Sequence, residues 1–327
     1  MTPRSIATGS VMLSLLVAAV PLGIAAAGSP AAPPAPGAGF GVGPVTAHEP
    51  RTEAWAAIAA DLEPVLDGAS PNPCTAGEPH CLEAVVAEME ARMDDLGCSH
   101  AAPFAFTYLE TTRGVDDHLA RDGSFEDPAE IAHLDALFAV LYFDAIDNWQ
   151  AGRHDQVPPA WQMAFEAADS RRASAAVDVM LGMNAHISRD LAYAVAQQLG
   201  DVPDPQQHDP TDFFRIDDVI QAVQQPMLDG AAARFDPQLA TLAQTLIPAE
   251  ADIDSTALIG LWREQAYDFG VRLAAADDAT TRAAVAAEIE RAAVASAVLI
   301  LNVGVTRDLG LSSDERSRYC EQQATGG

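Results

Sequence analysis

Three pairs of histidine and aspartate stand four residues apart in this sequence, and they are the first places where side chains could do chemistry. The pairs are His118 with Asp122, His186 with Asp190, and His208 with Asp212. Residues four apart on a helix meet on one face, so each pair could chelate a metal ion or orient an imidazole. The competing interpretation of each pair is a surface contact, and Asp212 also stands where an aspartate can cap a helix.

The second pair lies in the stretch LGMNAHISRDLAYAV, residues 181–195, which is otherwise largely apolar. Turning this stretch by about 100° per residue places Asn184 at the centre of an apolar arc. The arc comprises Leu181, Ile187, Leu191, Val195 and Leu199. We therefore expect Asn184 to be buried, and a buried amide needs hydrogen-bond partners. His186 and Asp190 fall on the other side, where a fully buried helix is expected to begin opening to solvent.

Asp135 is a further polar residue on an apolar face, in the helix predicted at 128–151. The apolar residues around it are Ile131, Leu134, Phe138, Leu141, Tyr142 and Trp149. A carboxylate is rarely buried unless it is paired or binds an ion. Asp135 therefore either has a functional role or is bonded to Tyr142 or to a backbone amide. Arg263 could neutralise a buried carboxylate, and a surface position is the alternative for this arginine.

These residues are consistent with two functions of different kinds. The first is a metal-dependent hydrolase whose catalytic residues are Asp135, His186 and Asp190. His186 and Asp190 would bind a divalent metal such as zinc, and either Asp135 or the pair His118 and Asp122 would complete the ligand set. The metal would lower the pKa of a bound water and supply hydroxide near neutral pH.

The second function is non-catalytic: an exported helical domain that binds a small or lipid-like molecule, or that is purely structural. In this case the buried polar side chains form a hydrogen-bonded network that fixes how the helices pack. The members of this network are Asp135, Asn184, His186 and Asp190. The side chains that we expect beside a bound ligand or cofactor are Asn184, Tyr142 and Arg263.

The composition excludes several other classes of function. The chain has 47 acidic residues against 18 basic ones, and its formal net charge is -29. This charge repels phosphate backbones, so nucleic acid is not an expected partner. All of the basic residues are arginines. The absence of lysine excludes Schiff-base chemistry on a lysine, a lysine general base and the GxxxxGK[ST] phosphate loop.

The N-terminus has the features of an export signal. Residues 1–27 contain one arginine, an apolar run from Val11, and small residues suited to signal peptidase. Pro21 and Gly23 interrupt this run, which is shorter than the roughly 20 residues that a membrane span needs. Residues 28–50 are rich in proline, alanine and glycine and predict a flexible linker. We therefore expect a secreted or cell-surface protein, exported by a Sec-type signal, with no stable membrane span after cleavage.

Four cysteines follow the signal, and in an oxidising compartment they favour two disulfides. A helix predicted between Cys81 and Cys98 would hold these two residues roughly 25 Å apart, beyond the reach of a disulfide. Of the two pairings left, we expect the one in which Cys74 closes a short loop with Cys81 and Cys98 binds Cys320. Four reduced thiols are the alternative.

The elements that must position these residues are helices, because the apolar spacing beyond residue 50 is helical almost everywhere. The predicted helices span 51–67, 82–97, 102–121, 128–151, 158–170, 172–200, 210–228, 236–246, 254–275 and 279–308. No alternating run is long enough to predict a strand. We predict an all-α protein with a single bundle-like, multi-helix domain at 51–310. It follows the signal peptide and linker, and a C-terminal tail at 311–327 is stapled by Cys320.

Several short motifs recur in one known family. They are FEDP at 125–128, LDALFAVLYFDA at 134–145, VPPAWQMAF at 157–165, LGMNAHISRDL at 181–191, DFFRIDDVI at 212–220 and WREQAYDFGVRL at 262–273. On these motifs the chain resembles an uncharacterised bacterial family of unknown function that is frequent in actinobacteria. The likeness covers roughly residues 50–305. It implies an all-helical domain, and it implies no assigned activity.

Overall fold

The computed structural model describes residues 50–53, 81–121, 123–200, 202–241, 255–306 and 311–325.

The starts of the helices follow the capping signals of the sequence. Helix α4 (Pro128–Gln150) begins after Asp127, whose side chain accepts a hydrogen bond from the backbone N–H of Glu130. Ser174 caps α6 (Ala175–Met183) in the same way. These caps satisfy backbone donors that a first helical turn leaves without partners.

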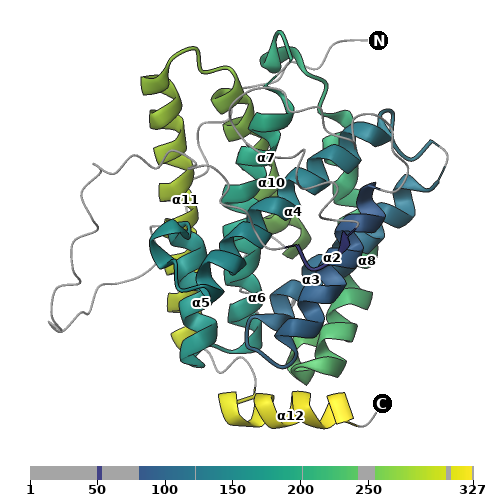
Figure 1. Cartoon of the computed structure of the whole chain (residues 1–327), viewed down its shortest axis with the longest axis vertical. Coiled ribbons are helices and arrows are strands. Elements are labelled where there is room, and N and C mark those ends of the chain that lie inside the picture. Colours follow the sequence, from purple (N-terminus) through teal and green to yellow (C-terminus); the bar gives the residue numbers. More distant parts are fainter. Residues whose placement is uncertain are drawn as a thin grey trace, which may run out of the picture. The chain divides into compact units, whose positions relative to one another are not determined.

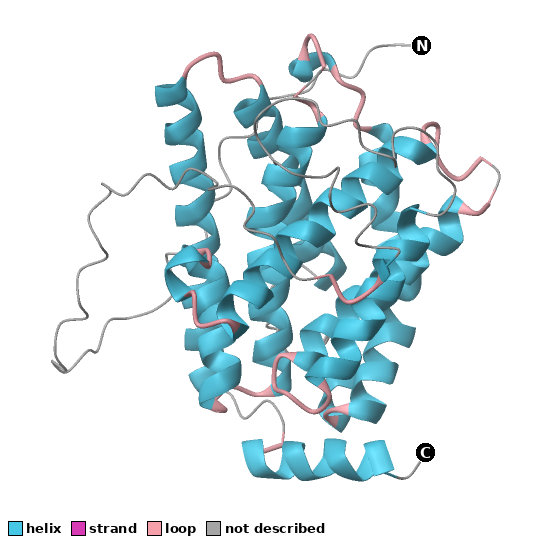
Figure 2. Ribbon diagram, in the orientation of Figure 1, coloured by secondary structure: helices cyan, strands magenta, loops and turns pink. Residues whose placement is uncertain are grey.

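All regular structure in the described residues is helical (Figure 1, Figure 2). The other helices are α2 (Cys81–Leu96), α3 (Ala102–Leu119), α5 (Pro159–Ser170), α7 (Leu191–Gln198), α8 (Thr211–Arg234), α10 (Ser255–Ala274), α11 (Ala279–Thr306) and α12 (Ser313–Thr325). Short 3-10 segments cover His154–Gln156, Pro205–Gln207 and Pro237–Thr241. The predicted all-α class is confirmed. The helix predicted at 51–67 lies almost wholly outside the described residues. The helix predicted at 236–246 is described only in part, and the described part forms the 3-10 segment Pro237–Thr241.

A central column of the fold is formed by α6, a π-helical segment at Asn184–Asp190 and α7, which follow one another without a break. In Figure 1, α6 and α7 lie between α11 on one side and α3 and α8 on the other. The column contacts α3, α4, α5, α10 and α11. Almost every side chain from Ala175 to Ala196 is buried. The expectation that the column opens to solvent near His186 was therefore wrong, because neighbouring helices cover it on all sides.

Two glycines allow other helices to approach this column closely. A Cβ atom on Gly182 would lie 2.3 Å from the ring of Phe104 in α3. A Cβ atom on Gly270 in α10 would lie 2.5 Å from a methyl group of Val195. Real Cβ contacts are never this short, so both positions need glycine for packing.

The predicted disulfide between Cys98 and Cys320 is confirmed, with the two Cα atoms 5.8 Å apart. Helix α2 extends from Cys81 almost to Cys98. The sequence-based exclusion of a disulfide between these two residues depended on this helix. Cys81 is also disulfide-bonded. Its predicted partner, Cys74, lies outside the described residues.

The C-terminal tail forms a helix, α12, which the sequence analysis did not predict. It contacts α8 and lies across the ends of other helices in Figure 1. Arg316 of α12 donates hydrogen bonds to the carboxylate of Asp178 in α6, at 2.6 Å, and to the carbonyl oxygen of His100, at 3.0 Å. All three residues are buried. The tail has no apolar stripe to reveal a helix, and a buried ion pair and a disulfide hold it to the rest of the fold.

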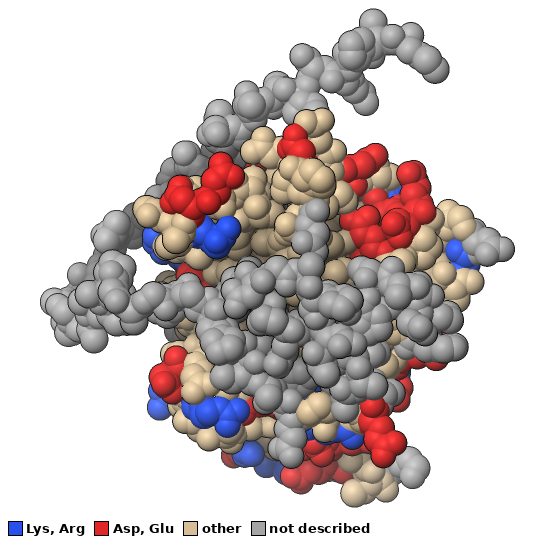
Figure 3. Space-filling model, turned by 45° about the horizontal axis from the view of Figure 1, so that its top comes forward, with Lys and Arg blue, Asp and Glu red and all other residues tan. Residues whose placement is uncertain are grey.

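The described residues belong to one compact unit. Acidic side chains outnumber basic ones on the face shown in Figure 3, in keeping with the net charge of -29. Within the part of the chain that the structure describes, every helix is too short or too polar to cross a membrane.

Candidate functional site

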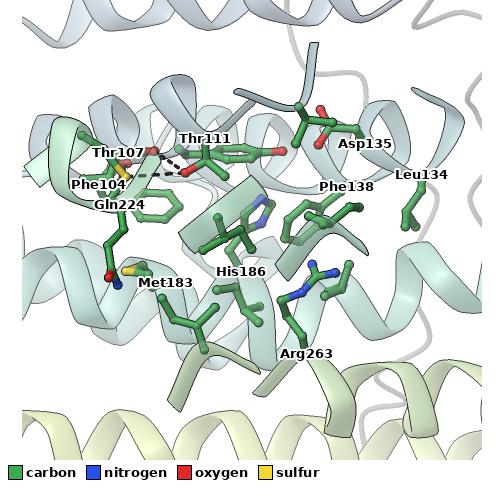
Figure 4. Close-up of a pocket in the computed structure, with 18 of the residues that line it drawn as sticks. Phe104, Thr107, Thr111, Leu134, Asp135, Phe138, Met183, His186, Gln224 and Arg263 are labelled. Carbon is green, nitrogen blue, oxygen red and sulfur yellow. Dashed lines mark hydrogen bonds between the residues drawn. The ribbon is translucent and has the colours of Figure 1, made fainter. Parts of the chain in front are cut away.

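A cavity of about 90 Å³ lies where α3, α4, α8 and α10 meet the central column (Figure 4). Twelve of the nineteen residues that line it are apolar. The polar or partly polar residues of the lining are Thr107, Tyr108, Thr111, Asp135, His186, Gln224 and Arg263. The structure therefore brings together three of the residues singled out in the sequence, namely Asp135, His186 and Arg263.

The π-helical segment presents His186 to this cavity. The backbone N–H of Leu191 donates to the carbonyl of His186, five residues earlier, in place of the usual four. Such wide turns are rare and occur frequently at functional sites. Six of the seven side chains of the segment are buried, so each of them faces protein rather than solvent. The segment thereby directs polar groups to more than one neighbouring helix.

His186 and Asp190 form a hydrogen-bonded pair one turn apart. Nδ1 of His186 lies 3.1 Å from Oδ2 of Asp190. Because an ionised carboxylate only accepts hydrogen bonds, we assign the ring proton to Nδ1. Burial lowers the pKa of His186, although the hydrogen bond to Asp190 opposes this shift. The imidazole is therefore neutral near pH 7, and its Nε2 carries a lone pair.

Asp190 is held by other donors besides the imidazole. The indole Nε1–H of Trp161 donates to its Oδ2 at 2.8 Å, and Nη1 of Arg189 donates to its Oδ1. Arg189 also donates through Nε to Glu290 of α11, at 2.7 Å. Asp190 thus accepts hydrogen bonds from three side chains, which fixes its orientation and that of His186.

Aromatic rings fix the plane of the imidazole. The ring of Phe138 stacks on His186 with centroids 3.4 Å apart and an interplanar angle of 5°. Tyr108 packs edge-on at 4.3 Å and Phe104 at 6.0 Å. Figure 4 shows Phe138 beside His186 in the wall of the cavity. The imidazole therefore has little freedom to rotate.

Asp135 is the second titratable group in the lining. The residue as a whole is half-buried, but its Oδ2 is buried and has no hydrogen-bond partner among the described residues. Burial, and to a lesser extent the charge of Asp116, raises the pKa of Asp135 to about 7, and the charge of Arg263 opposes this shift. The carboxyl group is therefore poised between its charged and neutral forms near neutral pH.

Nε2 of His186 is likewise buried without a hydrogen-bond partner among the described residues. A buried polar atom that makes no hydrogen bond costs about 1 to 3 kcal/mol, and such atoms are uncommon in native structures. Three of them, the Tyr108 hydroxyl, Asp135 Oδ2 and His186 Nε2, belong to residues that line one cavity.

Arg263 points toward Phe138 in Figure 4, and its charge is already matched. Its Nε donates to the carboxylate of Asp217 and its Nη2 to the carbonyl oxygen of Phe213. The guanidinium also lies 4.4 Å from the centroid of the Phe213 ring. Arg263 is buried, which corrects the alternative that it lies on the surface.

The other predicted site residues lie outside the lining of the cavity. Asn184 is fully buried, as predicted, and its Nδ2 donates to the carbonyl oxygen of Ala293 in α11 at 2.8 Å. Tyr142 is buried against the rings of Phe104 and Trp161. Both residues therefore support the packing around the site.

In the first pair, His118 lies in the last turn of α3 and contacts the backbone of that helix. Nδ1 of His118 lies 2.7 Å from the carbonyl oxygen of Gly114, one turn earlier in α3. His118 does not line the cavity. Asp122 lies outside the described residues.

In the third pair, Nε2 of His208 lies 2.8 Å from Glu130, and Nδ1 lies 3.0 Å from the hydroxyl of Tyr267. Asp212 instead accepts hydrogen bonds from the backbone N–H groups of Glu126 and Asp127. Across the described residues, no three His, Cys, Asp or Glu side chains are grouped so that they could hold a metal ion.

Sequence reasoning missed the partners that hold the His186–Asp190 pair. Trp161, Glu290 and Phe138 come from three other helices, and each looks like an ordinary core or surface residue in its own helix. The only signal available was the polar character of Arg189 within an apolar stretch, which indicates a buried acidic partner but does not identify it.

A model of a family of unknown function, DUF5995, matches residues 82–303, a range that includes every residue that lines the cavity. Neither the curated proteins nor the solved structures give a significant match.

Proposed function

Because the chain belongs to DUF5995, a family of unknown function, we propose from the cavity alone that it binds a small, largely apolar molecule. One observation carries this proposal. The cavity is lined mostly by apolar side chains, and three of its lining residues, Tyr108, Asp135 and His186, each hold a buried polar atom without a hydrogen-bond partner among the described residues. This combination of an apolar wall and a few fixed polar groups is typical of small-molecule sites.

The size of the cavity supports an organic occupant. A single water needs about 10 to 15 Å³ by this measure, so the cavity of about 90 Å³ could hold several waters. Each water needs two to four polar partners, and an apolar lining offers few of them. An empty cavity of 150 Å³ takes up benzene, so this smaller space fits a short chain, a small ring, or the end of a larger molecule.

The metal-dependent hydrolase is the less supported proposal. Asp190 would have to bind the metal through a carboxylate that already accepts hydrogen bonds from His186, Trp161 and Arg189. Elemental analysis of the purified protein separates the two proposals. A stoichiometric transition metal that is lost in His186→Ala would favour the hydrolase.

We also propose that the protein acts outside the cytoplasm. This rests on the apolar N-terminal stretch with its small residues, and on the disulfide between Cys98 and Cys320. The test is to express the full chain with its native N-terminus and to sequence the N-terminus of the secreted form. Retention of residues 1–27 in a cytoplasmic product would contradict the proposal.

Binding can be tested with toluene as the probe and ligand-observed NMR as the measurement. The variant Ile220→Trp places a large side chain at a partly buried position of the lining and should abolish binding. The control, Leu299→Trp, makes a comparable change on α11, where the side chain is 61% exposed, and should bind as the wild type does. Equal binding by both variants would mean that toluene binds elsewhere.

A further inference from the structure

We propose that the cavity selects neutral molecules that carry a hydroxyl group, and that this hydroxyl donates its hydrogen to Nε2 of His186. The inference deepens the proposed function and rests on it. It names the chemical class of the ligand and the residue that recognises it.

The direction of the hydrogen bond follows from the contacts of the imidazole. Nδ1 is committed to Asp190 and carries the ring proton, so Nε2 can only accept. Trp161 and Arg189 hold the Asp190 carboxylate, and Phe138 stacks on the imidazole plane. A ligand that reaches this buried nitrogen therefore meets a fixed acceptor and must bring the donor itself.

The charges around the cavity disfavour an anionic ligand. Asp190, which is hydrogen-bonded to His186, and the ionised fraction of Asp135 would repel a carboxylate, and the neutral His186 offers it no proton. Arg263 is the one cation in the lining, and its charge is matched by Asp217. A cationic ligand would have to give up its hydration to a mostly apolar wall, which is costly without a dedicated partner.

Asp135 adds a second reason to expect a hydroxyl. Because burial raises its pKa to about 7, a substantial fraction of this carboxyl group is protonated near neutral pH. A protonated carboxyl can donate a hydrogen bond. A hydroxyl group can both donate, as His186 requires, and accept, whereas an ether or a halogen can only accept.

The experiment compares three aromatic probes by calorimetry or ligand-observed NMR at pH 7. Phenol carries a donor, fluorobenzene has nearly the same shape without one, and benzoate carries a negative charge. We expect phenol to bind about tenfold or more tightly than fluorobenzene, and benzoate to bind most weakly. In His186→Phe, which keeps an aromatic ring against Phe138, the advantage of phenol over fluorobenzene should disappear.

A measurement on the wild type keeps the test decisive if His186→Phe does not fold. In ¹⁵N-labelled protein, the Nε2 resonance of His186 should shift on addition of phenol and stay unchanged with fluorobenzene. Equal affinities for phenol and fluorobenzene would overturn this inference and leave the proposed function standing. Preferred binding of benzoate would also overturn it. Failure of all three probes to bind would count against the proposed function itself.

Discussion

Replacing Asp135 by asparagine should change the pH dependence of stability. Asparagine has nearly the same shape as aspartate and cannot ionise. In the folded protein burial raises the pKa of Asp135 to about 7, from an ordinary value of 3.8. Between these two values the native state binds more protons than the unfolded state, so ionisation of Asp135 lowers the stability of the wild type as the pH rises.

The magnitude follows from the gap between the two pKa values. A gap of roughly 3 pH units at 1.36 kcal/mol each gives an upper bound of ~4 kcal/mol. Asp135 is half-buried as a residue, and solvent near a half-buried group screens its charge, so we expect about 1 to 3 kcal/mol. Asp135→Asn should therefore be more stable than the wild type by this amount at pH 8, and nearly equal to it at pH 4.

The assay is urea unfolding of both proteins, followed by circular dichroism at several pH values from 4 to 8. The difference between the two free energies of unfolding cancels most of the other titrating groups. Asp94→Asn, at an exposed position of α2, is the control and should show no such trend. If Asp135→Asn is destabilised at pH 8, then Asp135 is ionised and well paired in the native state, and our account of the cavity is refuted.

Two further predictions concern the packing around the site, and a third concerns the disulfide that holds α12. Gly182→Ala should destabilise the fold by about 1 to 3 kcal/mol in thermal unfolding, because the added Cβ would overlap an aromatic ring of α3. The control is Gly260→Ala in α10, where an added Cβ would have no atom within 4 Å. This control should be neutral or stabilise α10 by up to about 1 kcal/mol. Trp161→Phe should lower the free energy of unfolding by about 1 to 3 kcal/mol, because the carboxylate of Asp190 loses a buried hydrogen-bond donor. A melting temperature equal to that of the wild type would argue against a role for Trp161 in holding Asp190. Cys320→Ser should cost about 2 to 5 kcal/mol and expose α12 to limited proteolysis; unchanged resistance to protease would show that other contacts hold this helix alone.

The sequence also pointed correctly to part of the site. Asp135 and His186 stood out as polar residues on apolar helices, and both line the cavity. Asn184 stood out for the same reason, but its amide bonds to α11 instead. A helical wheel shows that a residue is buried, and it does not show which neighbouring helix it faces. The π-helical turn adds to this ambiguity because it departs from the 100° rotation that the wheel assumes.

What the sequence determined by itself was local. Helix starts such as that at Asp127 depend on bonds between residues three or four apart, and the exclusion of a disulfide between Cys81 and Cys98 depends only on the length of one helix. The tertiary structure decided the rest. A cavity is the volume that side chains from five parts of the chain leave unfilled, and the donors that hold Asp190 come from residues as far apart as Trp161 and Arg189. No local pattern encodes these contacts, because they exist only once the helices have packed.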